Sequence, residues 1–165
     1  MSRRTVLWLV PVFLALHNAE EALLFPRYLP LAIGRLPEGL RAFAGAITLG
    51  QVWAALAVVT AVPFALAAWA TARPDHRIAV WLLLVVQATV LLNVLWHLAA
   101  AIVVFQGYAP GVLTALAVNL PFSLYLLRRA RAEQWLSQRA RWALLPAALL
   151  LHGPLLSALL LLTER

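Results

Sequence analysis

The sequence predicts an all-α protein: a polytopic membrane helix bundle with five transmembrane helices. Of its 165 residues, 64% are apolar and only 12% are charged. Its mean hydropathy of +0.89 lies far outside the range of soluble domains. The apolar residues form runs long enough to cross a bilayer, which takes about 20 residues per helix. We therefore expect residues 1–165 to form a single transmembrane domain.

The first predicted span covers about residues 6–25, after the short basic head Ser2-Arg3-Arg4. A cleaved signal peptide would have a shorter apolar core followed by a cleavage site of small residues, whereas this chain has polar residues at 17–21. We therefore predict a retained span. Residues 26–42 contain three prolines and two glycines but remain apolar. This composition favours an interfacial flap rather than a span.

Four further apolar runs complete the predicted bundle. They cover about residues 43–72, 78–106, 111–127 and 142–162. The second and third spans are long enough to tilt or to extend beyond the hydrocarbon. The fourth begins at Pro110-Gly111, where proline suits the first position of a helix.

The arginines predict the orientation of the chain. All thirteen basic residues are arginines, and the net charge is +7. With the N-terminus inside, the inner side carries Arg3, Arg4, Arg73, Arg77, Arg128, Arg129, Arg131, Arg139 and Arg141. The outer side carries Arg27, Arg35, Arg41 and Arg165. The positive-inside rule then predicts an N-in, C-out topology, with a basic inner loop at 128–141 that contacts anionic lipids. Because the arginines flank apolar runs, we expect membrane lipids and no nucleic acid as partners.

Each predicted span carries a polar side chain at a similar depth. These residues are His17, Gln51, His97, Asn119 and His152. At a rise of about 1.5 Å per residue, they lie about 12–15 Å from the outer ends of their spans. Unsatisfied polar groups are costly against lipid, so we expect these side chains to face one another inside the bundle.

The spacing within the helices extends these positions into polar stripes. His17 is followed at i+3 by Glu20 and at i+4 by Glu21, and Asn93 precedes His97 by four residues. Residues three and four apart share one face of a helix. An ionised glutamate at this depth needs a cation or strong donors, and the chain has no lysine to supply one.

Histidines from three helices, together with two carboxylates, predict a divalent metal site. Neutral imidazoles are the commonest metal ligands, and three protein ligands with one open position typically hold a catalytic zinc. The candidate ligands are His17, His97, His152 and Glu21, with zinc favoured and iron possible. Glu20 or Glu21 is the candidate catalytic base that activates a water. The candidate residues for orienting ligands or substrate are Asn93, Asn119 and Gln51.

Three motifs together resemble those of the HXXEE family of bacterial integral membrane proteins. They are His17-x-x-Glu20-Glu21, Asn93-x-x-x-His97 and Pro110-Gly111. The resemblance spans essentially the whole chain and implies a multi-pass protein of the bacterial cytoplasmic membrane. It also implies that His17, Glu20, Glu21, Asn93 and His97 belong to one functional site. It does not supply the reaction.

Several functions remain open. The favoured one is a metal-dependent hydrolase that acts on a lipid ester or amide, or on a small apolar substrate. An iron-dependent membrane oxidoreductase is the second, although di-iron proteins normally use four carboxylates and only two lie at this depth. The third is a proton-coupled transporter or ligand-binding protein, which needs a polar path to the inner face, where Gln87 is the one candidate. A purely structural or assembly role and the oligomeric state also stay open.

Overall fold

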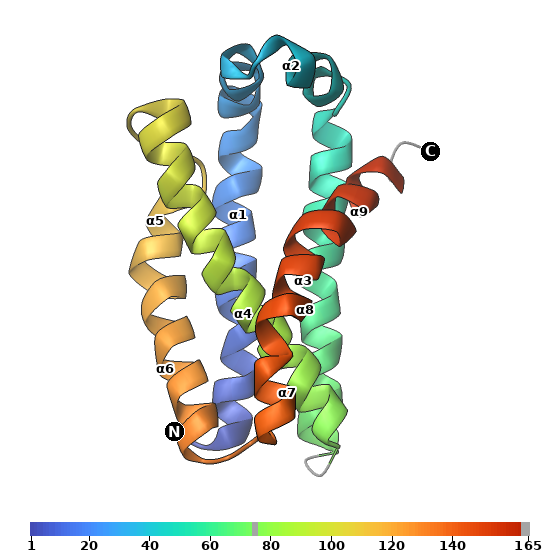
Figure 1. Ribbon diagram of the computed structural model, residues 1–165, viewed down its shortest axis with the longest axis vertical. Coiled ribbons are helices and arrows are strands. Elements are labelled where there is room, and N and C mark those ends of the chain that lie inside the picture. Colours follow the sequence, from blue (N-terminus) through green and yellow to red (C-terminus); the bar gives the residue numbers. More distant parts are fainter. Residues whose placement is uncertain (74–75, 163–165) are drawn as a thin grey trace.

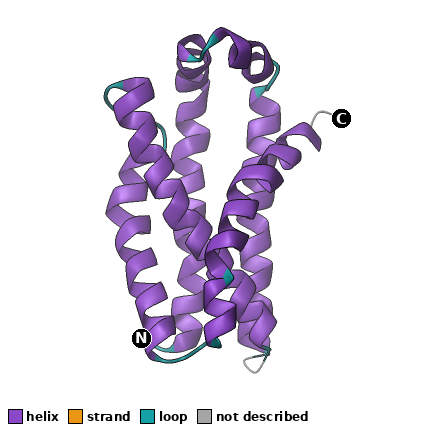
Figure 2. Cartoon of the chain, viewed as in Figure 1, coloured by secondary structure: helices purple, strands orange, loops and turns teal. Residues whose placement is uncertain are grey.

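The chain forms a bundle of long helices (Figure 1). The computed structural model describes residues 1–73 and 76–162, and no strand occurs within these ranges (Figure 2). The all-α prediction is therefore confirmed. Arg165, which we predicted on the outer side, lies outside the described residues.

Within the described ranges, five helical rods and one short helix make up this bundle. The first rod is α1 (Arg3–Arg35), the short helix is α2 (Glu38–Gly45), and the second rod is α3 (Leu49–Ala72). The third rod is α4 (Arg77–Ala99) with the π-helix η1 (Ala100–Phe105). The fourth is α5 (Val112–Thr114), the π-helix η2 (Ala115–Asn119) and α6 (Leu120–Ala132). The fifth is α7 (Gln138–Trp142), α8 (Leu144–Leu150), the π-helix η3 (Leu151–Leu155) and α9 (Leu156–Leu162).

Four of these rods are long and apolar enough to cross a membrane. They are Arg3–Arg35, Leu49–Ala72, Arg77–Phe105 and Gln138–Leu159. The rod from α5 to α6, which contains the predicted span 111–127, is not among them. Arg128 and Arg129 shorten its apolar stretch. It nevertheless packs into the bundle, where Gln87 Nε2 on α4 donates to Ser123 Oγ on α6 at 2.6 Å.

The helix α1 is longer than predicted, and its last turns include the first part of the predicted interfacial flap at 26–42. α1 continues through Pro26 to Arg35, and α2 then crosses the top of the bundle in Figure 1. A proline inside a helix leaves the carbonyl four residues earlier without its usual donor. Here that carbonyl belongs to Ala22, and Trp53 Nε1 on α3 donates to it at 3.2 Å. The neighbouring helix therefore compensates for the missing hydrogen bond.

The helix α3 begins at Leu49, later than the predicted residue 43, and this start changes the place of Gln51. Thr48 Oγ1 accepts from Gln51 N at 3.2 Å, and Gln51 Oε1 accepts from Thr48 N at 2.6 Å. This reciprocal pair is a capping box, which satisfies two free N–H groups at a helix start. Gln51 therefore lies in the first turn of α3, closer to a helix end than the predicted start at residue 43 implied.

The interior of the bundle has an apolar part and a polar part. The apolar part lies toward the end that carries the N-terminus, and it includes Val6, Val10, Val80, Leu83, Leu84 and Leu126. The buried polar residues are His17, Asn18, Glu21, Gln51, Gln87, His97, Asn119 and Ser123. The predicted inward orientation is thus confirmed for His17, His97 and Asn119. The polar part contains the candidate site.

Candidate metal centre

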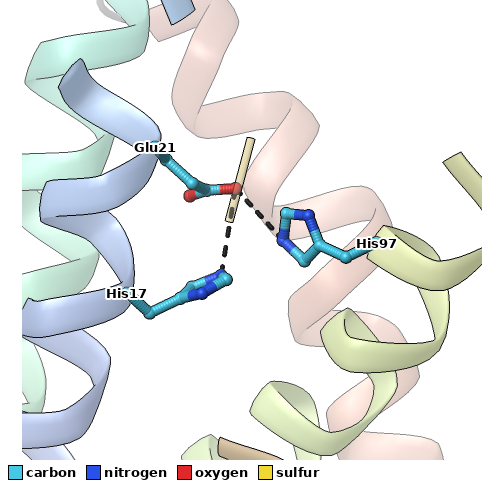
Figure 3. Close-up of side chains that lie close together, drawn as sticks. All are labelled: His17, Glu21 and His97. Carbon is cyan, nitrogen blue, oxygen red and sulfur yellow. Dashed lines mark ion pairs between the residues drawn. The ribbon is translucent and has the colours of Figure 1, made fainter. Parts of the chain in front are cut away.

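Three potential ligand groups from α1 and α4 meet in the polar part of the bundle. One ligand atom from each of His17, Glu21 and His97 lies within 4.8 Å of the others (Figure 3). Glu21 Oε1 is 3.2 Å from His97 Nε2 and 3.9 Å from His17 Nε2. The three residues are only 1–8% exposed. This group can hold a metal ion.

The helical spacing explains why these side chains meet. His17 and Glu21 are four residues apart on α1 and so share a face, and Asn93 and His97 do the same on α4. Asn93 Nδ2 lies 2.9 Å from both His17 Nε2 and His97 Nε2. An amide nitrogen only donates, so with the Asn93 amide in this orientation both Nε2 atoms accept and each imidazole has its proton on Nδ1. The two Nε2 lone pairs therefore point into the site.

A hydrogen-bonded chain holds the other side of the His17 ring. His17 Nδ1 lies 2.8 Å from Thr114 Oγ1, and Thr114 Oγ1 donates to Glu20 Oε2 at 2.5 Å. The imidazole N–H therefore donates to a hydroxyl whose own proton goes to a carboxylate. Metal-binding histidines are typically oriented by such an outer partner on the nitrogen that does not bind the metal.

Glu20 anchors the start of the fourth rod and lies outside the ligand group. In addition to the Thr114 hydroxyl, it accepts from the Tyr108 hydroxyl, from Leu113 N at 3.3 Å and from Thr114 N at 2.8 Å. Such donors stabilise an ionised carboxylate. They are the kind of strong donors that a glutamate at this depth was predicted to need. The role of water-activating base predicted for Glu20 does not fit this position, because its oxygens face α5.

Tyr108 is a protonated donor to Glu20. Burial of its hydroxyl, followed by the hydrogen bond to Glu20, raises the pKa of Tyr108 to about 12. The hydroxyl therefore remains protonated at neutral pH, and it ties the loop before α5 to α1.

Gly111 packs directly against the two imidazoles. Its φ of +80° is a left-handed conformation that favours glycine. A Cβ at this position would lie 2.7 Å from His97 Cε1 and 2.8 Å from His17 Cε1. The helix start was predicted at Pro110-Gly111, and the observed helix α5 begins nearby, at Val112. The turn also brings its backbone against the site.

Two further residues predicted for the site lie outside the ligand group. His152, on η3, is half-buried, but it is not one of the three converging residues. Asn119 is 1% exposed, and neither polar atom of its side chain has a hydrogen-bond partner within the described part of the chain. Gln51 caps α3, as described above. Two of the three predicted histidine ligands therefore converge.

Sequence reasoning missed Thr114, Tyr108 and Asn18. Asn18 Nδ2 donates to Thr60 Oγ1 at 2.7 Å and links α1 to α3. Thr114 gave little signal, because threonines in apolar helices commonly bond to their own backbone, as Thr60 does. The clue in the sequence that Thr114 belongs to the site was its position three residues after Gly111, in the first turn of a helix.

Three π-helical segments are found in the described ranges, and two of them, η1 and η2, adjoin residues of the site. η1 directly follows the helix that carries His97, η2 runs from the residue after Thr114 to Asn119, and η3 contains His152. Short π segments within α-helices frequently occur at functional sites. η1 and η2 thus mark the region of the ligand atoms, whereas His152 on η3 lies outside the ligand group.

The chain is similar to known proteins over most of its length. The family described as "Protein of unknown function with HXXEE motif" matches residues 8–126. The "Uncharacterized protein YrkK" of Bacillus subtilis (strain 168) is 26% identical over 147 residues, which cover 89% of this chain and 85% of that protein. No solved structure matches significantly. The family match includes His17, Glu21 and His97, whereas His152 lies outside it.

Proposed function

The chain belongs to the HXXEE family, whose function is unknown, and we propose that it is a membrane-embedded, metal-dependent enzyme of hydrolase type. The proposed site is one divalent metal, with zinc favoured, held by His17, His97 and Glu21. The proposed substrate is a lipid or a small apolar molecule.

The convergence of three electron-pair donors carries this proposal. The Nε2 atoms of His17 and His97 are both acceptors, and Glu21 Oε1 lies 3.2 Å from the second of them. A carboxylate oxygen and an imidazole lone pair at that distance repel each other unless a cation or a proton lies between them. No arginine pairs with Glu21 in the part of the chain that the structure describes. A metal ion or a proton therefore has to provide the positive charge.

The kind and number of donors favour a catalytic metal. Two imidazoles and one carboxylate form a known zinc-ligand set that leaves a fourth position open. A metal held this way would polarise a substrate carbonyl and lower the pKa of a bound water. The distances of Glu21 to both imidazoles favour a role as ligand over a role as catalytic base.

The remaining residues hold this arrangement. Thr114 and Glu20 fix the tautomer and the orientation of His17 through its Nδ1. Gly111 packs against both rings and limits their movement. A site whose ligands are held in advance loses less conformational freedom when it binds its metal.

The surroundings of the site favour an apolar substrate. Leu16, Trp96 and Leu113 are the sequence neighbours of site residues, and each is at least half exposed. In a bilayer these side chains would face acyl chains. A substrate could then reach the site sideways from the lipid, so we favour a lipid ester or amide.

An iron-dependent oxidoreductase is the second candidate. Two histidines and one carboxylate also form the facial set that holds mononuclear non-haem iron. The earlier objection, too few carboxylates for two irons, does not apply to a site with one iron. The identity of the metal separates the two candidates.

The interior gives less support to a transporter. Gln87 donates to Ser123, but toward the N-terminal end the described core beyond this pair consists of apolar residues such as Leu83, Leu84 and Leu126. A proton or polar ligand would need a polar path through that region. The polar interior therefore suits a site with access from one side.

We further propose that all five rods lie in the bacterial cytoplasmic membrane with the N-terminus inside. The N-terminus, the end of α3, the start of α4 and the connection from α6 to α7 lie at the same end of the bundle (Figure 1). Nine arginines flank these segments, which agrees with the positive-inside rule. The rod from α5 to α6 would be held at membrane depth by its neighbours.

Lipid analysis tests the proposed reaction. Detergent-purified protein, loaded with zinc or with ferrous iron in air, is incubated with a bacterial lipid extract, and the products are identified by mass spectrometry. We expect the zinc-loaded protein and the control His76→Ala to release hydrolysis products, and Glu21→Gln to release none. Oxygenated products formed with iron alone would favour the oxidoreductase. No change in any lipid with either metal would contradict both.

A further inference from the structure

Asn93 occupies the lone pairs that a metal would need. Its Nδ2 lies 2.9 Å from His17 Nε2 and 2.9 Å from His97 Nε2, so both of its N–H groups are used by these rings. Each Nε2 has one lone pair, which cannot serve an amide proton and a metal ion at the same time. Binding of a metal by both histidines therefore requires that the Asn93 amide moves away and finds a new acceptor.

Asn119 is a buried asparagine whose amide has no hydrogen-bond partner in the described part of the chain. It is 1% exposed, and both its Nδ2 and its Oδ1 lack a hydrogen-bond partner among the residues that the structure describes. Buried amides are nearly always hydrogen-bonded, so an orphaned one calls for an explanation. It also lies at the end of the π-helix η2, where the backbone departs from the α-helical pattern.

Asn93 and Asn119 lie along the same stretch of the bundle, between two sets of contacts that link neighbouring rods. One boundary is the hydrogen bond between Gln87 on α4 and Ser123 on α6. The other is His17, which contacts both Asn93 and Thr114. Asn93 lies beyond Gln87 toward the site on α4, and Asn119 lies between Thr114 and Ser123 on the fourth rod. The helix α4, which carries Asn93, contacts η2, which ends at Asn119, so a change of rotamer could bring the Asn93 amide to Asn119.

We propose that Asn119 is a positioning residue that receives the amide of Asn93 when the metal binds. This inference rests on the proposed metal site. In the observed arrangement Asn93 donates to the two histidines, and Asn119 has no hydrogen-bond partner among the described residues. In the metal-bound state the histidines bind the metal, and Asn93 and Asn119 pair through their complementary N–H and C=O groups.

The exchange predicts a distinct pattern of metal affinities. Asn119→Leu, which keeps the size of the side chain, should weaken metal binding about tenfold or more, as loss of an outer partner typically does. The same change should leave the metal-free protein at least as stable, because it removes an unpaired buried amide. Asn93→Ala should bind metal at least as tightly as the unmodified protein, because nothing then competes for the lone pairs.

A double-mutant cycle tests the inference. Zinc affinity is measured by competition with a chromophoric chelator for the unmodified protein, Asn93→Ala, Asn119→Leu and the double variant. Gln87→Leu is the control, since it removes a nearby buried amide whose partner, Ser123, lies outside the site. We expect Asn119→Leu alone to weaken zinc binding. The same change should have no further effect when Asn93→Ala is already present. Gln87→Leu should leave the zinc affinity unchanged.

The possible results separate this inference from the metal site itself. If the unmodified protein binds zinc and Asn119→Leu binds it equally well, the inference is wrong and the metal site stands. Weaker binding by Asn93→Ala would show that Asn93 is itself a ligand and would also overturn the exchange. If the unmodified protein and Asn93→Ala both bind no zinc or iron, the metal site fails and the inference fails with it.

Discussion

His17 Nδ1 lies 2.8 Å from the hydroxyl of Thr114, whose proton goes to Glu20. This contact gives the two adjacent glutamates of the motif different tasks. Glu21 faces the Nε2 side of His17, where a metal can bind, whereas Glu20 fixes the Nδ1 side through Thr114. Both carboxylates act on the same imidazole from opposite sides, which accounts for the pairing of the glutamates.

Removal of the Thr114 hydroxyl should weaken metal binding. Thr114→Val leaves the Nδ1–H of His17 without its acceptor and removes one donor from Glu20. We expect metal affinity to fall about 10–100-fold, as it does when outer partners of ligands are lost. The measurement is zinc competition, with Thr89→Val as the control, since Thr89 bonds to the carbonyl of Val85 on its own helix. Equal affinities of both variants would contradict the orienting role of Thr114.

A side chain at position 111 should disrupt the site. In Gly111→Ala the new methyl would press on both imidazoles, and the positive φ would strain any residue other than glycine. We expect a loss of about 1–3 kcal/mol in the free energy of unfolding from the backbone alone, together with loss of metal. Gly153→Ala is the control, because its Cβ would meet nothing within 4 Å. Metal binding by Gly111→Ala at the level of this control would refute the close packing.

Tyr108 makes the stability of the loop before α5 sensitive to high pH. Its folded-state pKa is raised from 10.0 to about 12, so the stabilisation is complete below pH 10 and is lost as the pH rises toward 12. Ultraviolet titration of tyrosinate should therefore show a tyrosine that ionises near pH 12 and is absent from Tyr108→Phe. A Tyr108 that titrates near pH 10 would argue against its hydrogen bond to Glu20.

The cap of α3 should affect stability and not the site. Thr48→Ala removes the side-chain oxygen that accepts from Gln51 N. We expect the free energy of unfolding to fall by about 1 kcal/mol, the usual cost of losing such a cap. Zinc affinity should remain unchanged, because the capping box lies outside the ligand group. A large loss of affinity would return Gln51 to the candidate site.

The spacing of residues predicted the part of the site that lies within single helices. The i, i+4 relation on α1 and on α4 placed His17 beside Glu21 and Asn93 beside His97. Composition was likewise enough to predict an all-helical chain with long apolar helices. These features depend on local geometry, which the sequence specifies directly.

Features that depend on contacts between helices were less predictable. α1 continues past Pro26 because Trp53 on another helix donates to the freed carbonyl. Tyr108 in the loop before α5 and Thr114 on α5 both donate to Glu20, which lies far earlier in the chain on α1. Depth alone placed Gln51 and His152 with the site, but depth does not specify where a helix starts or how it is rotated. The spacing Thr48-x-x-Gln51 matches a capping box in the sequence, and this match would have placed Gln51 at the start of a helix.

Element analysis of the detergent-purified protein tests the central claim most directly. The protein is expressed with zinc and iron available and compared with His97→Ala and with His76→Ala, which removes a histidine from the far end of α4. All three are first shown to be equally folded. We predict close to one metal per chain in the unmodified protein and in His76→Ala, and none in His97→Ala. No metal in any of them, even after reconstitution with zinc or iron, would contradict the metal site and leave a proton shared between Glu21 and His97.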